Sequence, residues 1–474
     1  MSASAIVVGS GPNGLAGAVR LAEAGLSVTV LEAADTIGGG TRTSQHTLPG
    51  LLHDDCSAFH PTGAASPYLQ SLHLERNGLE FLLPPVQMAH PLDDGSAGLL
   101  HHSLDQTAEG LGRDGAAWSQ LFGPLVRNFD LLTRELFQPV VHLPRHPIAL
   151  AQFGPAALLP ATTLARIWKD EQAKALFGGV AAHLIAPLNR PLSSSVGLML
   201  TAAGHAYGWP VAKGGSQAIA DALAARIIEL GGTIETGVRV DDLAQLTGAD
   251  VVLLDLAPPA VGQLLGDRLP PRDRKLYAGY RFGPGAFKLD LAVEGGVPWR
   301  NPDVAKAGTV HLGGTLQEIA RSEADVWAGR MPQRPFVLVG QQYLADPSRS
   351  VGDIHPVWAY AHVPANWTGD ATEAILDQIE RFAPGMRERI VGSFSRSAPQ
   401  LQQYNPNYVG GDIATGANSL TQVVLRPGSP RNPYRTGAQG FYLCSAATPP
   451  GAGVHGMGGF NAAETALKDL AAAG

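Results

Sequence analysis

Residues 4–15 read SAIVVGSGPNGL, and this stretch decides the fold. The apolar run 4–8 predicts a buried strand, residues 9–14 predict a glycine-rich turn, and residues 15–24 predict a helix that ends at Gly25. A second apolar strand is expected at residues 27–31. Strands this apolar are typical of a parallel sheet that is covered on both faces. The chain therefore opens with a predicted βαβ unit.

The turn carries the pattern Gly9-x-Gly11-x-x-Gly14, which is typical of dinucleotide binding when it joins a strand to a helix. Gly9 permits the tight turn, Gly11 lets a pyrophosphate approach the backbone, and Gly14 lets the helix pack against the sheet. The free amides at the start of the helix attract the phosphates. Glu32 ends the second strand, where its carboxylate can bind both ribose hydroxyls. The alternative is a glycine turn in an unrelated α/β fold.

Two further glycine clusters point to a cofactor longer than NAD. Residues 37–42 read IGGGTR and suit a cofactor whose diphosphate and ribityl chain continue past the first loop, although a plain surface turn is the alternative. Residues 448–459 read TPPGAGVHGMGG and lie between a predicted strand and the last helix. Backbone amides there, which we assign to Gly453 and Val454, can hold the negative charge that collects at the flavin N1–C2=O2 locus. The three clusters together predict that the chain binds FAD.

The remaining sequence divides by its secondary-structure pattern. Residues 66–204 are rich in Leu and Pro with helical periodicity, and we expect a mostly helical cap or substrate region there. Residues 266–429 alternate strands with helices and predict a substrate domain with a mixed sheet. The pattern returns to α/β at residues 205–265, which include an expected strand at 238–242, and again at 430–474. The predicted fold class is α/β: a discontinuous Rossmann-like FAD-binding domain (1–65, 205–265 and 430–474), the substrate domain and the cap.

Composition narrows the class of protein. The chain has 474 residues, enough for two or three domains, and a net charge of −7 without a basic block, so nucleic acid is not an expected partner. No secretory signal peptide or membrane span is expected. The most apolar stretch, residues 148–165, is broken by Gly and Pro and is expected to be a cavity wall or a shallow membrane-contacting surface; the alternative, which the sequence pattern favours slightly, is a buried loop-and-helix piece. Two cysteines, Cys56 and Cys444, make no disulfide framework, which favours the cytoplasm.

The same segments resemble the phytoene desaturase-related flavoproteins of the amine oxidase-like superfamily, nearest the pyridine nucleotide-disulfide oxidoreductase domain-containing subgroup. The resemblance is carried from one end of the chain to the other, by residues 7–15 (VVGSGPNGL), 30–32 (VLE), 37–39 (IGG), 48–50 (LPG), 211–215 (VAKGG), 238–240 (VRV) and 450–456 (PGAGVHG). It implies bound FAD, contacted by Gly9, Gly11, Pro12, Asn13, Gly14, Glu32, Ala33, Gly39, Gly40, Thr41, Arg42, Val240, Gly451, Gly453 and Val454.

Two details refine the resemblance. It implies that Val240 contacts the adenine through its backbone and that residues 451–454 lie beneath the isoalloxazine. The chain departs from the Gly-Gly-Arg of carotenoid desaturases, because Gly40 replaces the arginine and Arg42 follows two places later. This difference puts a carotene substrate in doubt.

Lys288 and His455 are the candidate catalytic residues. Lys288 lies in an otherwise apolar predicted strand and resembles the amine oxidase lysine that holds a water at flavin N5, although a solvent-facing lysine is the alternative. His455 lies in the C-terminal glycine cluster. The residues His53, Asp54, Asp55, Cys56 and His60 fit no compact zinc spacing, so no metal is expected.

These observations predict an FAD-dependent oxidoreductase that acts on C–H or C=C bonds of a hydrophobic substrate. The low charged fraction (16%) and the apolar cap favour such a substrate, and the resemblance suggests an isoprenoid, polyene or acyl chain, with oxygen or a quinone as electron acceptor. One alternative is an amine or amino-acid oxidase that uses Lys288. Another is a non-catalytic lipid escort that resembles the Rab GDP-dissociation inhibitors. The expected location is the cytoplasm, with peripheral membrane contact through the apolar cap, and the oligomeric state is left open.

Overall fold

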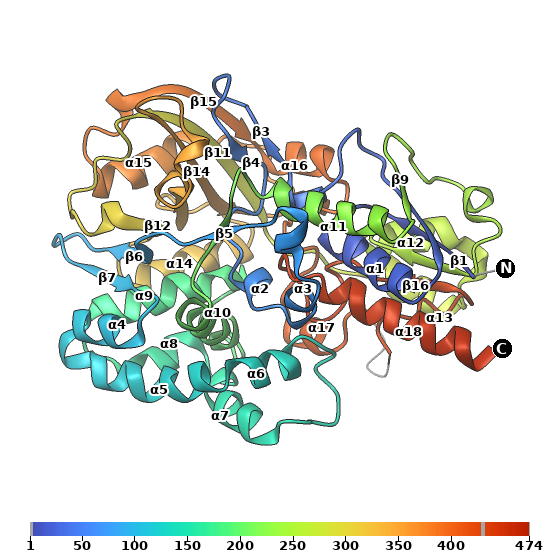
Figure 1. Ribbon diagram of the computed structural model, residues 1–474. Helices are drawn as coiled ribbons and strands as arrows, with labels where there is room; N and C mark the ends of the chain where they lie inside the picture. Colours follow the sequence, from blue (N-terminus) through green and yellow to red (C-terminus); the bar gives the residue numbers. More distant parts are fainter. Residues whose placement is uncertain (1–2, 428–431, 474) are drawn as a thin grey trace.

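The computed structural model describes residues 3–427 and 432–473, so residues 1, 2, 430, 431 and 474 of the predicted FAD-binding segments lie outside the described part (Figure 1). The glycine loop leaves a sheet of five parallel strands. Their spatial order is β16 (Phe441–Leu443), β10 (Val251–Leu254), β1 (Ser4–Val8), β2 (Ser27–Leu31) and β9 (Thr233–Glu235). Strands from three distant parts of the chain thus share one sheet.

Helices cover both faces of this sheet, as the apolar strands predict. One face packs against α1 (Pro12–Glu23), α11 (Gln217–Glu229) and α18 (Met457–Ala473), and the other against α12 (Pro258–Leu265) and α13 (Pro271–Ala278). The C-terminal helix α18 runs directly beside the first helix α1 (Figure 1).

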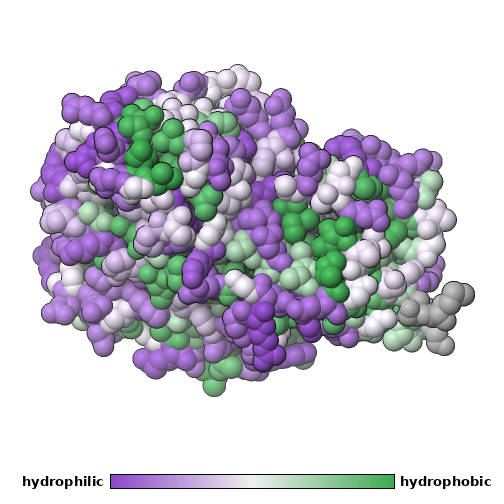
Figure 2. Space-filling view, turned by 45° about the horizontal axis from the view of Figure 1, so that its top comes forward, coloured by the Kyte–Doolittle hydropathy of each residue, from purple (hydrophilic) through white to green (hydrophobic). Residues whose placement is uncertain are grey.

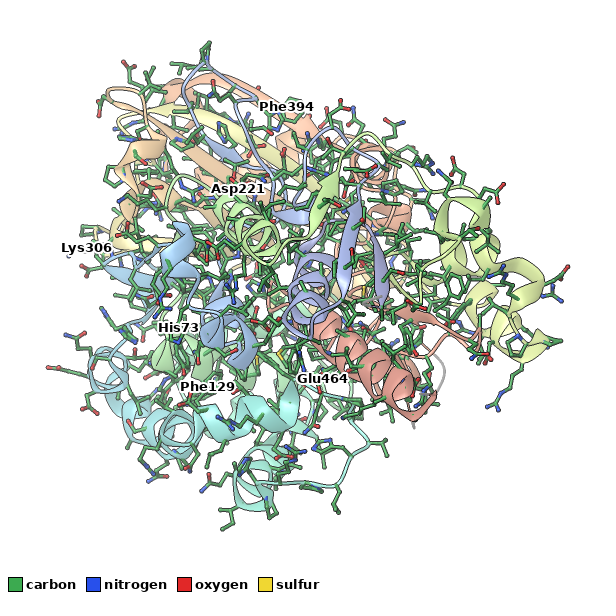
Figure 3. The ribbon with its side chains drawn as sticks, turned by 45° about the vertical axis from the view of Figure 1, so that its right-hand side comes forward. His73, Phe129, Asp221, Lys306, Phe394 and Glu464 are labelled. Carbon is green, nitrogen blue, oxygen red and sulfur yellow. The ribbon has the colours of Figure 1, made fainter. Side chains whose placement is uncertain are left out.

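Close backbone packing holds the two ends of the chain together. A Cβ on Gly459 of α18 would lie only 1.7 Å from the carbonyl oxygen of Asn13 and 2.7 Å from the amide nitrogen of Gly17. Arg20 of α1 also pairs with Glu464 of α18 at 2.6 Å; Figure 3 labels Glu464 on this helix. The helices therefore touch backbone to backbone at a position that only glycine fits.

A second sheet of seven strands is mixed. Its order is β15 (Ile390–Arg396), β11 (Gly285–Glu294), β14 (Ile354–Val363), β13 (Val337–Gly340), β12 (Ala307–Leu312), β6 (Val86–Pro91) and β7 (Ala97–Leu100); the β12–β6 pair is parallel and the others antiparallel. One face packs on α15 (Thr372–Phe382), and the other carries Met88, Leu338, Trp358 and Tyr360 toward the cap. The predicted fold class, α/β with a Rossmann-like unit and a mixed sheet, is confirmed.

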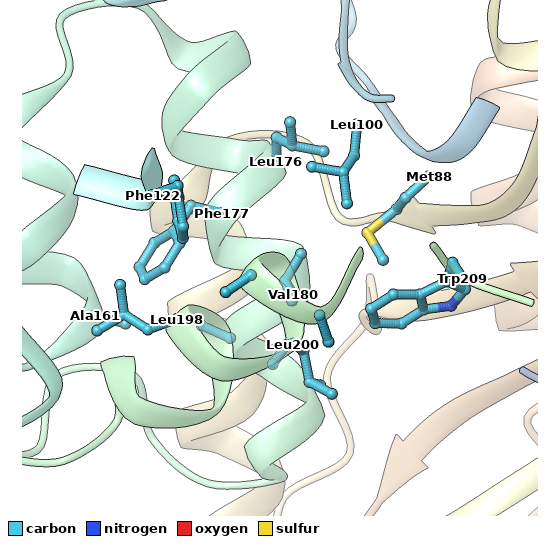
Figure 4. Close-up of a cluster of buried hydrophobic side chains, with 14 of the residues drawn as sticks. Met88, Leu100, Phe122, Ala161, Leu176, Phe177, Val180, Leu198, Leu200 and Trp209 are labelled. Carbon is cyan, nitrogen blue, oxygen red and sulfur yellow. The ribbon is translucent and has the colours of Figure 1, made fainter. Parts of the chain in front are cut away.

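The cap is a bundle of short helices. It comprises α4 (Leu104–Gly110), α5 (Gly115–Arg127), α6 (Phe129–Leu136), α7 (Pro147–Ala157), α8 (Ala161–Leu164), α9 (Glu171–Ala181) and α10 (Ser194–Ala206). Phe122, Phe177 and Leu198 interlock at its centre, and Met88 and Trp209 extend the same core toward the sheet (Figure 4). Among the described residues no single helix is long and apolar enough to cross a membrane. The helical segments Pro147–Ala157 and Ala161–Ile167, which are bent by 90° relative to each other, are together long and apolar enough by length and composition alone.

Two local predictions differ from the structure. Strands β6 and β7 lie inside the range 66–204 that the sequence assigned to the cap; β6 pairs with β12 and β7 pairs with β6, which extends the mixed sheet. Residues 238–242 form no strand: the Val238 amide donates to the Glu32 carbonyl at 2.8 Å, but no ladder follows. In both places, whether a strand forms depends on pairing with a distant segment of the chain, and the local sequence pattern does not contain this information.

Smaller elements complete the framework around these layers. They are α2 (Pro61–Ala64), α3 (Pro67–Ser71), α14 (Leu316–Trp327), α16 (Ala398–Tyr404) and α17 (Leu420–Val424), with the strand pairs β3 (Thr43–Ser44) with β4 (His53–Asp54) and β5 (Phe81–Leu82) with β8 (Val211–Ala212). The face shown in Figure 2 is largely hydrophilic, with apolar side chains in separate patches.

Candidate functional site

The glycine loop has the shape that a dinucleotide site needs. Gly9 has φ +99°, which favours glycine, and a Cβ on Gly14 would lie 2.1 Å from the Gly9 carbonyl oxygen. Gly9 and Gly11, with Pro12 and Asn13 beside them, line a cavity of about 1350 Å³, whereas Gly14 lies behind the loop. Gly9 thus permits the tight turn, Gly11 permits a pyrophosphate to approach the backbone, and Gly14 permits close packing, as their spacing predicts.

Glu32 is held beside this loop by the end of β2. Its Oε2 accepts hydrogen bonds from the amide (2.9 Å) and hydroxyl (2.5 Å) of Ser10, and its Oε1 accepts from the Ala34 amide at 2.9 Å. Arg42 approaches Oε1 at 3.4 Å. Glu32 and Ala33 both line the cavity, so the carboxylate is oriented and accessible to a ribose.

The second glycine cluster adjoins the first loop. A Cβ on Gly39 would lie 3.1 Å from Gly11 Cα, and a Cβ on Gly40 would lie 2.2 Å from the Tyr408 hydroxyl oxygen. Gly39, Gly40, Thr41 and Arg42 line the cavity. The Arg42 guanidinium donates to the Thr36 carbonyl at 2.7 Å as well as facing Glu32. Arg42 therefore balances the charge of Glu32 within the site.

The C-terminal turn closes the cavity from another side. Gly451 (φ +110°) and Gly453 (φ +137°) adopt conformations that favour glycine, and a Cβ on Gly453 would lie 2.9 Å from His455 Cδ2. Gly451, Gly453, Val454 and His455 all line the cavity. The Ser66 hydroxyl donates to the His455 carbonyl at 2.6 Å, which fixes the turn against the start of α3. The two ends of the chain therefore border one cavity.

His455 is neutral in this setting. Its Nδ1 accepts from the Met457 amide at 3.1 Å, while its buried Nε2 has no partner among the described residues. Burial lowers the pKa of His455 to about 4; hydrogen bonds to nearby backbone groups raise this pKa, but by less. Val240 lines the cavity together with Val238 and Asp241, at the end where β2 and β9 place Glu32.

Beyond the turn the cavity continues as an apolar chamber between the cap and the mixed sheet. The cap contributes Phe153, Leu158, Ile185 and Met199, and the sheet contributes Leu338, Trp358 and Tyr360. Small-molecule sites are commonly about 300–1,000 Å³. A cavity of about 1350 Å³ therefore has room for a dinucleotide and for part of a second molecule.

Lys288 lies on the sheet face that points to this chamber but does not line the cavity. The residue is 3% exposed, so the solvent-facing alternative is wrong. Its ammonium pairs with Asp290 and lies 5.9 Å from the centre of the Trp358 ring. Burial raises the pKa of Asp290, but Lys288 and His53, whose Nδ1 lies 3.3 Å from Asp290 Oδ1, hold that pKa below its usual range. A catalytic role for Lys288 remains a prediction.

The residues considered for a metal have other partners. Asp54 pairs with Arg349 at 2.6 Å, and Asp55 pairs with Arg396 at 2.7 Å. Within the described ranges, no group of three or more His, Cys, Asp or Glu side chains is arranged to hold a metal ion. Cys56 and Cys444 are both free.

The polar residues that line the cavity and that sequence reasoning missed include Asp255, Arg426 and His183. Asp255 directly follows β10, as Glu32 directly follows β2, so its position after a buried strand was a usable signal. Arg426 is buried and donates to Asn418 Oδ1 at 2.6 Å. His183 shares a 3.0 Å hydrogen bond with His311. His183 lies in the 3-10 turn that follows α9, and Arg426 lies in an irregular segment, so no periodic pattern marks either residue.

Comparisons with known proteins agree with this geometry. The family of NAD(P)-binding Rossmann-like domains matches residues 7–73. Pyridine nucleotide-disulfide oxidoreductase domain-containing protein 2 of Rattus norvegicus is 24% identical over 98% of this chain and 93% of its own length. Hydroxyneurosporene desaturase of Cereibacter sphaeroides is 27% identical over 98% of each chain. The structure of putrescine oxidase with putrescine bound superposes with a TM-score of 0.61 at 18% identity, over 100% of this chain and 99% of that one.

The chain is similar to oxidoreductases of the amine oxidase-like and phytoene desaturase-like class, and its fold matches that of amine oxidase structures. Within that class it is similar over nearly its whole length to pyridine nucleotide-disulfide oxidoreductase domain-containing protein 2. The resemblance inferred from the sequence is confirmed.

Proposed function

We propose that the chain binds FAD and removes hydrogen from C–H bonds of a hydrophobic substrate, an isoprenoid, polyene or acyl-like chain. One observation carries the proposal: a single cavity extends from the glycine loop, past the C-terminal turn, into an apolar chamber. Its first part suits a dinucleotide and its second part suits an apolar chain.

The residues fit FAD because glycines stand where a side chain would intrude. A Cβ on Gly39 would lie 3.1 Å from Gly11 Cα, and a Cβ on Gly453 would lie 3.1 Å from Thr62 Oγ1. Both close contacts therefore depend on the absence of a side chain at these glycines. Glu32 is oriented to bind the ribose of the adenylate half. The amides at the start of α1 would hold the diphosphate, and those of residues 451–454 would face the redox-active ring.

Bound FAD supplies a hydride acceptor. The protein contributes binding, orientation and exclusion of water. The chamber walls from α7, α10 and β14 hold an apolar chain by burying it, which stabilises the complex by about 25 cal/mol per Å² of apolar surface removed from water. His455 stays neutral at pH 7, so it does not place a positive charge beside the turn.

Amine oxidation is the weaker proposal. Trp358 and Tyr360 do form an aromatic pair on the chamber wall, with ring centres 4.9 Å apart. However, Lys288, on which this alternative depends, does not line the cavity. The lipid-escort alternative has no need of the C-terminal turn that this chain carries.

Anaerobic mixing with candidate substrates tests the proposal. Long isoprenoid or acyl chains should bleach the oxidised flavin spectrum, whereas primary amines should not. Met199→Trp, which narrows the chamber on α10, should leave the flavin spectrum intact and abolish bleaching by the long chain. Bleaching by amines alone, with hydrogen peroxide released in air, would replace this proposal with amine oxidation.

We further propose that the substrate enters from a membrane surface on the cytoplasmic side. Leu143, Ile148 and Leu158, on and beside α7, are 90%, 74% and 62% exposed. Leu158 also lines the cavity, so the exposed apolar surface continues into the chamber. Residues 136–169 contain no Asp or Glu in a chain of net charge −7, and their Arg and Lys side chains suit anionic lipid.

A further inference from the structure

A second carboxyl group lies against the glycine loop. Asp255 follows β10 directly, and its Oδ2 accepts a hydrogen bond from the Gly14 amide at 3.1 Å. A Cβ on Gly11 would lie 2.5 Å from the same oxygen, and one on Gly9 would lie 3.2 Å from Asp255 Cβ. Asp255 thus contacts every glycine of the loop and occupies amides at the start of α1, beside the place where a diphosphate would bind.

The charges around Asp255 are unbalanced. No Lys, Arg or His nitrogen in the described part of the chain lies within 4 Å of its carboxyl group, whereas Glu32 has Arg42. Burial raises the pKa of Asp255 to about 7, with Glu32 adding to the rise and the Gly14 and Gly11 amides opposing it.

The remaining groups that face Asp255 are uncharged. The Cys444 thiol, directly after β16, stays neutral because burial raises its pKa well above the usual value. Asn407 donates to the Asp255 carbonyl at 2.9 Å and carries no charge. A diphosphate would therefore add two negative charges beside an unpaired, buried carboxyl group, and this arrangement is costly at short range unless that group is neutral.

We propose that Asp255 binds the dinucleotide as a neutral carboxylic acid, so that at alkaline pH the cofactor enters together with one proton from solvent. This inference rests on the proposed FAD binding. Asp255 Oδ1 accepts no hydrogen bond from the described residues, and Asp255 lines the cavity. In the protonated acid, Oδ1 can donate a hydrogen bond to a cofactor oxygen. Asp255 is then a positioning residue, and the bound proton neutralises the carboxyl group, which has no cation of the described residues beside it.

The proposal predicts a pH dependence with a definite sign. The acid form is present below pH 7 and is lost as the pH rises through the pKa of Asp255. Above that point the affinity for FAD should fall about tenfold per pH unit, because each binding event must first take up a proton. Between pH 6.5 and pH 8.5 the dissociation constant should rise by more than about tenfold.

The test titrates FAD into the full-length apoprotein and follows the quenching of flavin fluorescence at both pH values. Calorimetry at pH 8.5 in two buffers of different ionisation enthalpy counts the protons, and close to one should be taken up per FAD. Asp255→Asn, which is neutral at every pH and can still donate, should bind FAD equally well at both pH values without proton uptake. Asp250→Asn, at the exposed opposite end of the same strand, should behave like the unaltered chain.

Two outcomes would overturn the inference: affinity that is independent of pH in the unaltered protein, or proton uptake that persists in Asp255→Asn. The calorimetric count on the unaltered protein needs no variant, so the test survives a folding defect. A protein that binds no FAD at either pH would instead overturn the proposed function.

Discussion

Replacing Gly459 with alanine should separate the two helices that join the ends of the chain. The added Cβ would lie 1.7 Å from the Asn13 carbonyl oxygen, 2.7 Å from the Asn13 carbonyl carbon and 2.7 Å from the Gly17 amide nitrogen. All three atoms belong to the α1 backbone, so no rotamer change relieves the clash. Because ordinary contacts begin near 3.4 Å, α1 and α18 must part by more than about 1 Å.

Overpacking of a core typically costs about 1–3 kcal/mol, and a clash with backbone belongs at the upper end. For a chain of this length, a loss of about 3 kcal/mol should lower Tm by about 3 °C if the chain unfolds as one unit, and by more if the Rossmann unit unfolds alone. The same shift displaces the turn that precedes α18, so we expect Gly459→Ala to lose flavin as well.

Thermal unfolding followed by circular dichroism, with flavin content measured in parallel, provides the assay. The control is Gly110→Ala at the exposed end of α4, where nothing lies within 4 Å of the added Cβ; it should be neutral or stabilising by up to about 1 kcal/mol. A Gly459→Ala protein with the control's Tm and full flavin content would refute the close packing of α1 and α18.

Three further predictions concern cofactor affinity, acid stability and membrane contact. Glu32→Gln should weaken FAD binding by about 10–100-fold, because it removes a charged acceptor from the ribose, and fluorescence titration measures the change. Burial lowers the pKa values of His60 and His455 to about 4, so the unfolded chain binds more protons below pH 6.5; stability should fall as the pH drops from 6.5 toward 4, and a Tm unchanged over that range would contradict the burial of neutral imidazoles. Leu143→Asp should reduce co-sedimentation with anionic vesicles several-fold, whereas Ile228→Asp, equally polar but on α11 of the Rossmann unit, should not; equal losses in both would remove the membrane proposal.

The local sequence pattern was sufficient to predict the site residues at positions where the backbone conformation admits only one residue type. Gly9, Gly14 and Gly453 were predicted because a positive φ or a contact below 3 Å admits no side chain, and the structure shows these constraints. Glu32 was predicted because the end of β2 places it beside the loop. These constraints act within a few residues, so the sequence displays them directly.

Long-range pairing accounts for what the sequence did not predict. Strand β6 joins the mixed sheet through its partner β12, which lies more than two hundred residues away in the sequence. The alternation of polar and apolar residues suggested that Lys288 faces solvent. Its strand is buried on both faces, however, and the Lys288 ammonium pairs with Asp290, two residues further on. Asp255 was missed because its importance depends on the three glycines that it contacts across the sheet.

The most direct test of the account is the identity of the cofactor in the purified protein. Heat release followed by chromatography should yield FAD at close to one molecule per chain, and the intact protein should show the absorption bands of oxidised flavin. A colourless protein that takes up no FAD on reconstitution, or one that releases only NAD or an adenylate, would contradict the claim that the glycine loop and residues 451–454 enclose a single flavin.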